Sequence, residues 1–205
     1  IIGEHKLRIS HNFCVLPGQK IEDIHEVHSH PIALMQCEDF LQNHHSIRVV
    51  ESDDTALSAQ EIVEQNITGR AAICSSFAAK KYGLEVLAEE IETNKRNFTR
   101  FLVVTPADRV AEFFDITKAN KSTIVFTLPH EEGSLAHVLS ILSFYKVNLT
   151  KIQSLPVIGR EWEYQFYISL TFSNYERYHQ SLDAIRPLLK DFYELGEYME
   201  SPTPQ

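Results

Sequence analysis

The stretch Trp162-Glu-Tyr-Gln-Phe-Tyr-Ile-Ser-Leu-Thr-Phe172 decides the fold of the second half of the chain. Large apolar residues occupy every second position, and mostly polar residues lie between them. Because successive side chains of a strand point to opposite faces, this alternation predicts a β-strand with one buried face. We expect helices of the same domain, rather than a partner protein, to cover that face.

Further elements on both sides of this strand complete the order β-α-β-β-α-β. Alternating or extended stretches predict strands at 124–128, 148–157 and 193–199. Apolar stripes with helical spacing predict helices through 135–142 and 178–192. Pro187 predicts a kink or an early end in the second helix. This order is typical of a ferredoxin-like α+β domain, which we place at 122–199.

The first half of the chain has a different pattern, in which short apolar runs alternate with helical stretches. Strands are expected at 8–16, 24–29, 47–50, 71–74 and 101–105. Helices are expected at 32–43, 55–66 and 76–82. Such alternation implies crossover connections and a largely parallel α/β sheet. We place this domain at 1–106, a linker at 107–121 and a short tail at 200–205.

Composition narrows the class of protein. The chain has 205 residues, of which 43% are hydrophobic, so it is too apolar for a disordered tail. A net charge of -9 argues against a surface built for nucleic acid or anionic lipid. No apolar run approaches the roughly 20 residues that span a bilayer. Three widely spaced cysteines and no signal peptide favour a reducing cytoplasm.

A histidine cluster superficially offers metal ligands. His25, His28 and His30 precede Cys37. In a strand, however, His28 and His30 share one face while His25 points to the other. No second pair of ligands accompanies the cysteine, so we predict no metal site.

Short motifs lie along the whole chain in a fixed order: Ser29-His30-Pro31, Gln36-Cys37, Ser52 with Thr55-Ala56, Tyr82-Gly83-Leu84, Thr99-Arg100-Phe101, Gly133-Ser134-Leu135, Ser154-Leu155-Pro156 and Trp162-Glu163-Tyr164. In this order and spacing they resemble the prephenate dehydratases. Each motif is weak alone, but the ordered set is specific. The resemblance implies a catalytic region like the type II periplasmic binding proteins, followed by a ferredoxin-like ACT regulatory domain.

The resemblance also implies an activity. The family converts prephenate to phenylpyruvate, water and carbon dioxide on the route to phenylalanine. Aromatisation drives this elimination, so no cofactor or metal is expected. Phenylalanine commonly inhibits the family by binding between ACT domains of a dimer or tetramer. We therefore expect prephenate and L-phenylalanine as ligands and a homo-oligomer as the assembly.

By resemblance, Thr99 is the residue essential for activity. A threonine hydroxyl is a poor acid, so we expect it to hydrogen-bond the departing ring oxygen rather than ionise. Arg100 is expected to hold a carboxylate, and helix starts at Ser52–Thr55 and Ser75 offer N–H groups to anions. The full set of expected substrate-binding residues is Arg100, Phe101, Asn97, Ser52, Thr55, Ser75 and His30.

Two departures from the family pattern stand out. The family has a first lobe with a Glu-Asn-Ser motif that nothing here matches, so we expect a fragment without turnover on its own. The effector motif Glu-Ser-Arg-Pro is replaced by Gln153-Ser154-Leu155-Pro156. The Gly-Ala-Leu motif is replaced by Gly133-Ser134-Leu135. Both stretches remain the expected effector site.

Two alternatives stay open. Arogenate dehydratase performs the same elimination on the amino-acid analogue of prephenate, and these residues do not separate the two substrates. A non-catalytic, amino-acid-sensing ACT protein is the alternative from another class. A Glu-Asn-Ser-bearing lobe encoded upstream of Ile1 would favour the enzyme.

Overall fold

The computed structural model describes residues 1–202 and divides the chain into two compact units. One unit is Leu7–Thr99, and the other combines Ile1–Lys6 with the chain from Arg100 onward. The division therefore falls at Thr99, ahead of the boundary at residue 106 that the sequence suggests. Residues 203–205 of the expected tail lie outside the described residues.

A five-stranded sheet forms the centre of the Leu7–Thr99 unit, which we call the α/β unit. Its strands, in the order β4-β3-β5-β2-β6, are β4 (Arg48–Glu51), β3 (Glu26–Ser29), β5 (Arg70–Cys74), β2 (Asn12–Val15) and β6 (Glu85–Ala88). Strand β3 runs parallel to β4 and β5, as crossover connections require. Strand β2 runs antiparallel to β5 and β6. The sheet is therefore mixed, and not largely parallel as expected.

Helices cover both faces of this sheet. They are α1 (Pro31–Gln36), α2 (Glu38–Gln42), α3 (Thr55–Glu64) and α4 (Ser76–Tyr82). Neighbouring residues Phe13 and Cys14 of β2 belong to separate apolar cores, because they point to opposite faces. The helix expected at 32–43 is broken at Cys37, whose φ and ψ are −106° and 22°. Helix α4 ends as expected at Gly83, in the left-handed region at φ 70°.

Two further strands form a separate two-stranded sheet. They are β1 (Gly3–Arg8) and β7 (Phe98–Val103). The strand expected at 8–16 is therefore two strands, β1 and β2, in different sheets. The boundary between the two units falls within both β1 and β7.

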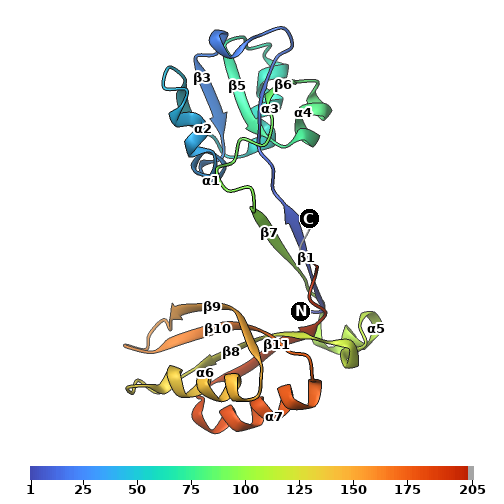
Figure 1. Cartoon of the computed structure of the whole chain (residues 1–205), viewed down its shortest axis with the longest axis vertical. Helices are drawn as coiled ribbons and strands as arrows, with labels where there is room; N and C mark the ends of the chain where they lie inside the picture. The colour runs from blue at the N-terminus through green and yellow to red at the C-terminus, as the bar shows by residue number, and fades with distance from the viewer. Residues whose placement is uncertain (203–205) are drawn as a thin grey trace. The chain divides into compact units, whose positions relative to one another are not determined.

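The rest of the chain contains the ferredoxin-like unit. Its elements in order are β8 (Lys121–Thr127), α6 (Ser134–Phe144), β9 (Asn148–Pro156), β10 (Tyr164–Thr171), α7 (Tyr175–Ile185) and β11 (Phe192–Tyr198). The strands lie in the order β11-β8-β10-β9, and all pairs are antiparallel. Both helices lie on the same face of this sheet (Figure 1). The predicted β-α-β-β-α-β order is confirmed.

The alternating stretch that predicted this unit forms its core. Ile168 and Leu170 of β10 are fully buried beneath the helices. Phe172 stacks on Tyr178 of α7, with ring centroids 4.1 Å apart. Trp162 is the exception, because it precedes the strand and is 71% exposed. The apolar face is thus covered by helices of the same unit, as predicted.

Short helices connect β7 to β8. The segment contains η2 (Ala107–Arg109), α5 (Val110–Phe113) and η3 (Ile116–Lys118). Beyond α7, the chain forms another short helix, η4 (Arg186–Leu188), and Pro187 lies within it, as the expected early end of α7 requires. Among residues 1–202, no helix has the length and apolar character needed to cross a bilayer.

Candidate functional site

A groove of about 350 Å³ in the α/β unit brings together three of the expected site residues, His30, Thr55 and Thr99. Its other lining residues are Ile9, His11, Ile32, Ala33, Gln36 and Asp54. Thr99 is exposed, and its hydroxyl has no hydrogen-bond partner within residues 1–202. A free hydroxyl in a groove with other polar groups is available to a ligand. We call this site the Thr99 groove.

His30 is held in the groove by its place at the start of α1. It is the N-cap residue, and its Nδ1 accepts a hydrogen bond from the backbone N–H of Ile32 at 3.2 Å. Pro31 occupies the first helical position, where its missing N–H costs nothing. Because Nδ1 accepts, a neutral His30 carries its proton on Nε2. The Nε2–H group is then a donor for a ligand.

The start of α3 contributes an acid rather than free N–H groups. The Asp54 carboxylate caps the helix, accepting from the N–H groups of Ala56 at 2.7 Å and Leu57 at 3.0 Å. These amides are therefore already occupied, contrary to the idea that this helix start presents free donors to an anion. Asp54 instead brings a negative charge to the groove beside Thr55.

The serines expected to bind substrate are engaged with the protein itself. Ser52 Oγ lies 2.6 Å from Ser58 Oγ, beside the cap of α3. Ser75 caps α4 by accepting from the N–H of Ala78 at 3.1 Å. Neither serine lines the Thr99 groove.

Besides Asp54, two polar groove residues, Gln36 and His11, were not among the expected site residues. Gln36 lies at the end of α1, and its Oε1 accepts a hydrogen bond from Asn97 Nδ2 at 2.9 Å. His11 is 7% exposed, and its Nε2 lies 2.8 Å from the same oxygen. Asn97, which was expected, thus supports the groove through Gln36. Gln36 belongs to one of the family motifs, whereas nothing in the local sequence singles out His11.

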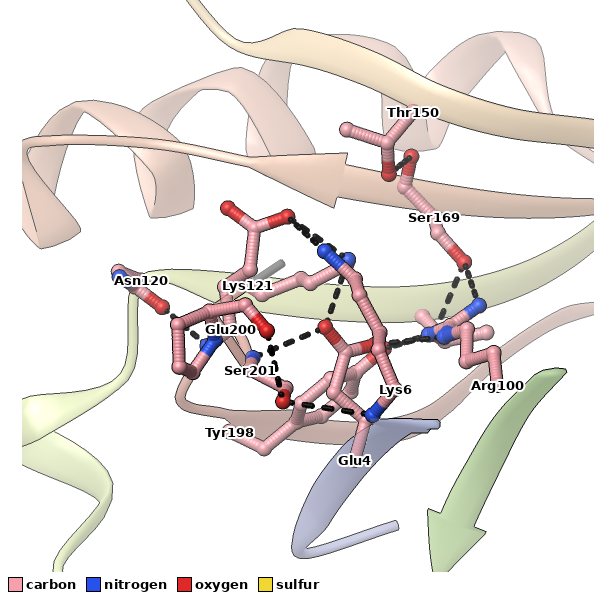
Figure 2. A network of polar contacts seen from close by, with 12 residues as sticks. Glu4, Lys6, Arg100, Asn120, Lys121, Thr150, Ser169, Tyr198, Glu200 and Ser201 are labelled. Atoms are coloured by element: carbon pink, nitrogen blue, oxygen red, sulfur yellow. Dashed lines mark hydrogen bonds and ion pairs between the residues drawn. The ribbon is translucent and has the colours of Figure 1, made fainter. Parts of the chain in front are cut away.

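Arg100 and Phe101 belong to the other unit. The guanidinium of Arg100 pairs with Glu4, Nε to Oε2 at 2.5 Å, and also donates to Tyr198 and Ser169 (Figure 2). Neighbouring residues of a strand point to opposite faces, so Arg100 faces away from the side chain of Thr99. Its contacts give no support to its expected role as a substrate ligand.

Glu4 is the centre of this second set of contacts. Its side chain is fully buried and also accepts from Lys121 Nζ at 2.9 Å and from the N–H of Ser201 at 3.1 Å (Figure 2). Burial alone would raise the pKa of Glu4, but the hydrogen bonds from Lys121, Ser201 and Arg100 hold it below its ordinary value. The carboxylate stays charged and binds β1 to the ferredoxin-like unit.

A cavity of about 150 Å³ in the ferredoxin-like unit contains part of the expected effector site. Ser134 and Leu135 line it, with the segment 128–131 and with Trp162, Tyr164 and Phe166. Gly133 is the N-cap of α6 at φ 79°. The stretch 153–156 lies on β9 and does not line the cavity. The structure therefore brings together one of the two effector motifs with three aromatic side chains.

Two of the residues that were weighed as metal ligands lie apart from one another in other surroundings. His28 Nε2 lies 3.2 Å from Glu26 Oε1, and Cys37 is buried in an apolar core. Within residues 1–202, no three His, Cys, Asp or Glu side chains come together as a metal site.

The mixed α/β unit and the ferredoxin-like unit define a protein that joins a lobe of the type II periplasmic-binding-protein class to an ACT domain. A prephenate dehydratase from Arthrobacter aurescens, solved in complex with L-Phe, superimposes with a TM-score of 0.77 at 28% identity, covering 97% of this chain and 65% of that one. The sequence model of the prephenate dehydratase family matches residues 1–109. The chain belongs to this family.

The relatives of this chain include prephenate dehydratases and arogenate dehydratases. A bifunctional chorismate mutase/prephenate dehydratase of Buchnera aphidicola is 34% identical over 208 residues, covering 100% of this chain and 53% of the relative. Arogenate dehydratase/prephenate dehydratase 2 of Arabidopsis thaliana is 38% identical over 157 residues, covering 77% of this chain and 40% of the relative. The chain spans about half the length of the first of these relatives.

Proposed function

We propose that the Thr99 groove takes part in the decarboxylating dehydration of prephenate to phenylpyruvate. Family membership supports the reaction class. The observation that carries the assignment is the free Thr99 hydroxyl, which shares one groove with His30 and Gln36. All three side chains offer hydrogen-bond donors to a ligand.

This dehydration requires hydrogen-bond donors at the departing oxygen rather than a strongly acidic side chain. The ring carboxylate leaves as carbon dioxide, and its bonding electron pair enters the ring. The ring C–O bond breaks, and the departing hydroxyl takes up a proton from solvent and leaves as water, since Thr99 donates a hydrogen bond without ionising. Thr99 donates to this oxygen while charge develops on it, with His30 and Gln36 fixing the rest of the substrate.

The test is a pair of substitutions at Thr99 in the full gene product. Thr99→Ala removes the donor, and we expect kcat to fall about 10²–10³-fold. Thr99→Ser keeps the hydroxyl and is expected to retain most of the activity. Phenylpyruvate formation is the measurement. Normal turnover by Thr99→Ala would refute the assignment.

Arogenate is the second candidate substrate, and Asp54 is the observation that favours it. Arogenate carries an ammonium group where prephenate carries a keto group, and a carboxylate in the groove attracts a cation. Asp54→Asn keeps a side chain that caps helices well but removes the charge. If arogenate is preferred, this variant shifts the ratio of kcat/KM values toward prephenate in a competition assay. An unchanged ratio would leave Asp54 without a role in substrate choice.

We further propose that L-phenylalanine binds the ferredoxin-like unit at the cavity beside Ser134 and Leu135. Three aromatic side chains line this cavity, and the Arthrobacter aurescens relative is described as a complex with L-Phe. Calorimetry on the full gene product tests this proposal. We expect binding heat with millimolar L-phenylalanine and a loss of at least tenfold in affinity for Trp162→Ala. Absence of heat in the wild type would refute effector binding.

Homo-oligomerisation, as a dimer or tetramer, belongs to the same proposal. Strand β9 is at the edge of the sheet and leaves backbone groups unpaired on one side. Light scattering with and without L-phenylalanine measures the state directly. A monomer under both conditions would exclude it. If L-phenylalanine binds while prephenate and arogenate are not turned over, the non-catalytic sensing protein becomes the better description.

A further inference from the structure

A buried acid lies next to the groove residue His11. Glu92 is 1% exposed, and its Oε2 accepts a hydrogen bond from the backbone N–H of His11 at 2.9 Å. Its Oε1 has no hydrogen-bond partner within residues 1–202, and Arg8 Nη2 lies 3.9 Å from it. A buried carboxylate costs free energy unless it is well paired. An apolar residue would fill this space at lower cost, so packing alone does not account for Glu92.

The segment that carries Glu92 also fixes the backbone of two groove residues. The carbonyl of His11 accepts from the N–H of Ile91 at 2.8 Å, next to the bond that the N–H of His11 donates to Glu92. The carbonyl of Gln36 accepts from the N–H of Thr93 at 2.8 Å. Residues 91–93 therefore hold His11 and the end of α1 in one arrangement.

The contact between the side chains of His11 and Gln36 determines which of the two atoms donates the hydrogen bond. Asn97 Nδ2 donates to Gln36, and because an amide nitrogen only donates, the atom that receives it is the oxygen Oε1. His11 Nε2 lies 2.8 Å from the same oxygen and must therefore carry a proton. The oxygen of Gln36 is thus held by two donors. Its amide nitrogen keeps both N–H groups free of partners within residues 1–202.

We propose that His11 is a positioning residue of the Thr99 groove, and that Glu92 fixes the backbone of His11 for this purpose. His11 holds the Gln36 carboxamide by its oxygen, so that the amide nitrogen is presented to a ligand. The proposal rests on the proposed dehydratase function. Without the His11 side chain the Gln36 carboxamide rotates, and a misplaced donor costs up to about 10²-fold in rate.

Three substitutions of His11 in the full gene product separate positioning from packing. The amide nitrogen of a glutamine lies where Nε2 of a histidine lies, whereas that of an asparagine lies where Nδ1 lies. We expect His11→Leu and His11→Asn to lose about 10-fold to 10²-fold in kcat/KM, and His11→Gln to recover most of this loss. Equal losses in His11→Gln and His11→Asn would overturn the proposal.

His44 provides the matched control. It is a partly buried histidine of the same unit, its Nδ1 lies 2.8 Å from the carbonyl of Phe40, and it does not line the groove. His44→Leu removes one histidine hydrogen bond from the unit without touching Gln36. We expect it to keep the kcat/KM of the wild type. If it falls as far as His11→Leu, the loss reflects general destabilisation and the proposal fails.

A second measurement does not depend on the reaction. The side-chain amide signals of Gln36, followed by ¹⁵N NMR, report whether its carboxamide is ordered. We expect an ordered amide in the wild type and in His11→Gln, and a mobile one in His11→Asn and His11→Leu. Equal order in all four proteins would overturn the positioning role. An ordered amide that depends on His11, in a protein without dehydratase activity, would refute only the proposed function. If His11→Leu does not fold, the glutamine and asparagine variants decide alone.

Discussion

Two adjacent residues, Thr99 and Arg100, have unrelated surroundings in the structure. Thr99 and Arg100 form one motif, yet one lines a groove and the other is paired with a buried acid. Adjacent residues of a motif can have different roles, because the side chains of neighbouring residues in a strand point to opposite faces. The expected role of Thr99 could be stated from the sequence. The partners of Arg100 could not, because Glu4 and Tyr198 are distant in the chain.

Glu4 offers a stability prediction at this scale. Glu4→Gln removes the charge that pairs with Lys121 and Arg100, and Lys121 is nearly fully buried. We expect the free energy of unfolding to fall by about 3 kcal/mol, because a buried cation loses its partner. Urea unfolding measures this, with Glu200→Gln as the control. Glu200 is partly exposed and its loss should cost less than about 1 kcal/mol.

The pH dependence of the Glu4 contribution follows from the direction of its shift. Its pKa in the folded protein lies below the ordinary value of 4.5. The stabilisation is therefore fully present above about pH 4.5 and is lost as the pH falls through the folded pKa. A difference between wild type and Glu4→Gln that persists unchanged to about pH 2 would contradict this assignment.

Elements of structure were predictable where one period dominates. The strand at 164–171 has a strong pattern and forms close to where it was expected. Helix α7 forms too, but it ends at Ile185 and does not reach Phe192, which begins β11. Strand β6 was missed, because Glu85–Ala88 is short and follows a turn without its own pattern. The direction of β2 was also missed. Strand direction depends on pairing with β5 and β6, which no local pattern records.

Strand β11 offers a prediction at the scale of one element. Glu194 is exposed as a whole residue, but partial desolvation of its carboxyl group, together with the neighbouring carboxylate of Glu197, raises its pKa to about 7. Between about pH 4.5 and pH 7 the folded protein therefore holds a proton that the unfolded chain has released. The free energy of unfolding should fall as the pH rises through this window. Urea unfolding at several pH values should show a smaller decline for Glu194→Gln, and an identical decline would contradict the assignment.

At the scale of the whole molecule, the sequence identified both folded units but not how the chain is divided between them. The mixed charge and weak pattern of residues 107–121 suggested a boundary at residue 106. The ion pairs of Glu4 and Arg100 place the first residues of the chain with its second half instead. Contacts between segments about a hundred residues apart leave no signal in a local pattern. The Thr99 groove could not be predicted from a local pattern either, because β7, α1 and the start of α3 all contribute residues to it.

The division within strands β1 and β7 has a topological consequence. The α/β unit is an insertion into the sequence of the other unit, and two strands of one sheet carry the chain in and out. At its entry and exit, the N–H of Ile9 donates to the carbonyl of Asn97 at 2.9 Å, so the two ends are already adjacent. Segments whose ends meet are the ones that proteins gain or lose as whole domains. Excising this unit would require two cuts and one short turn.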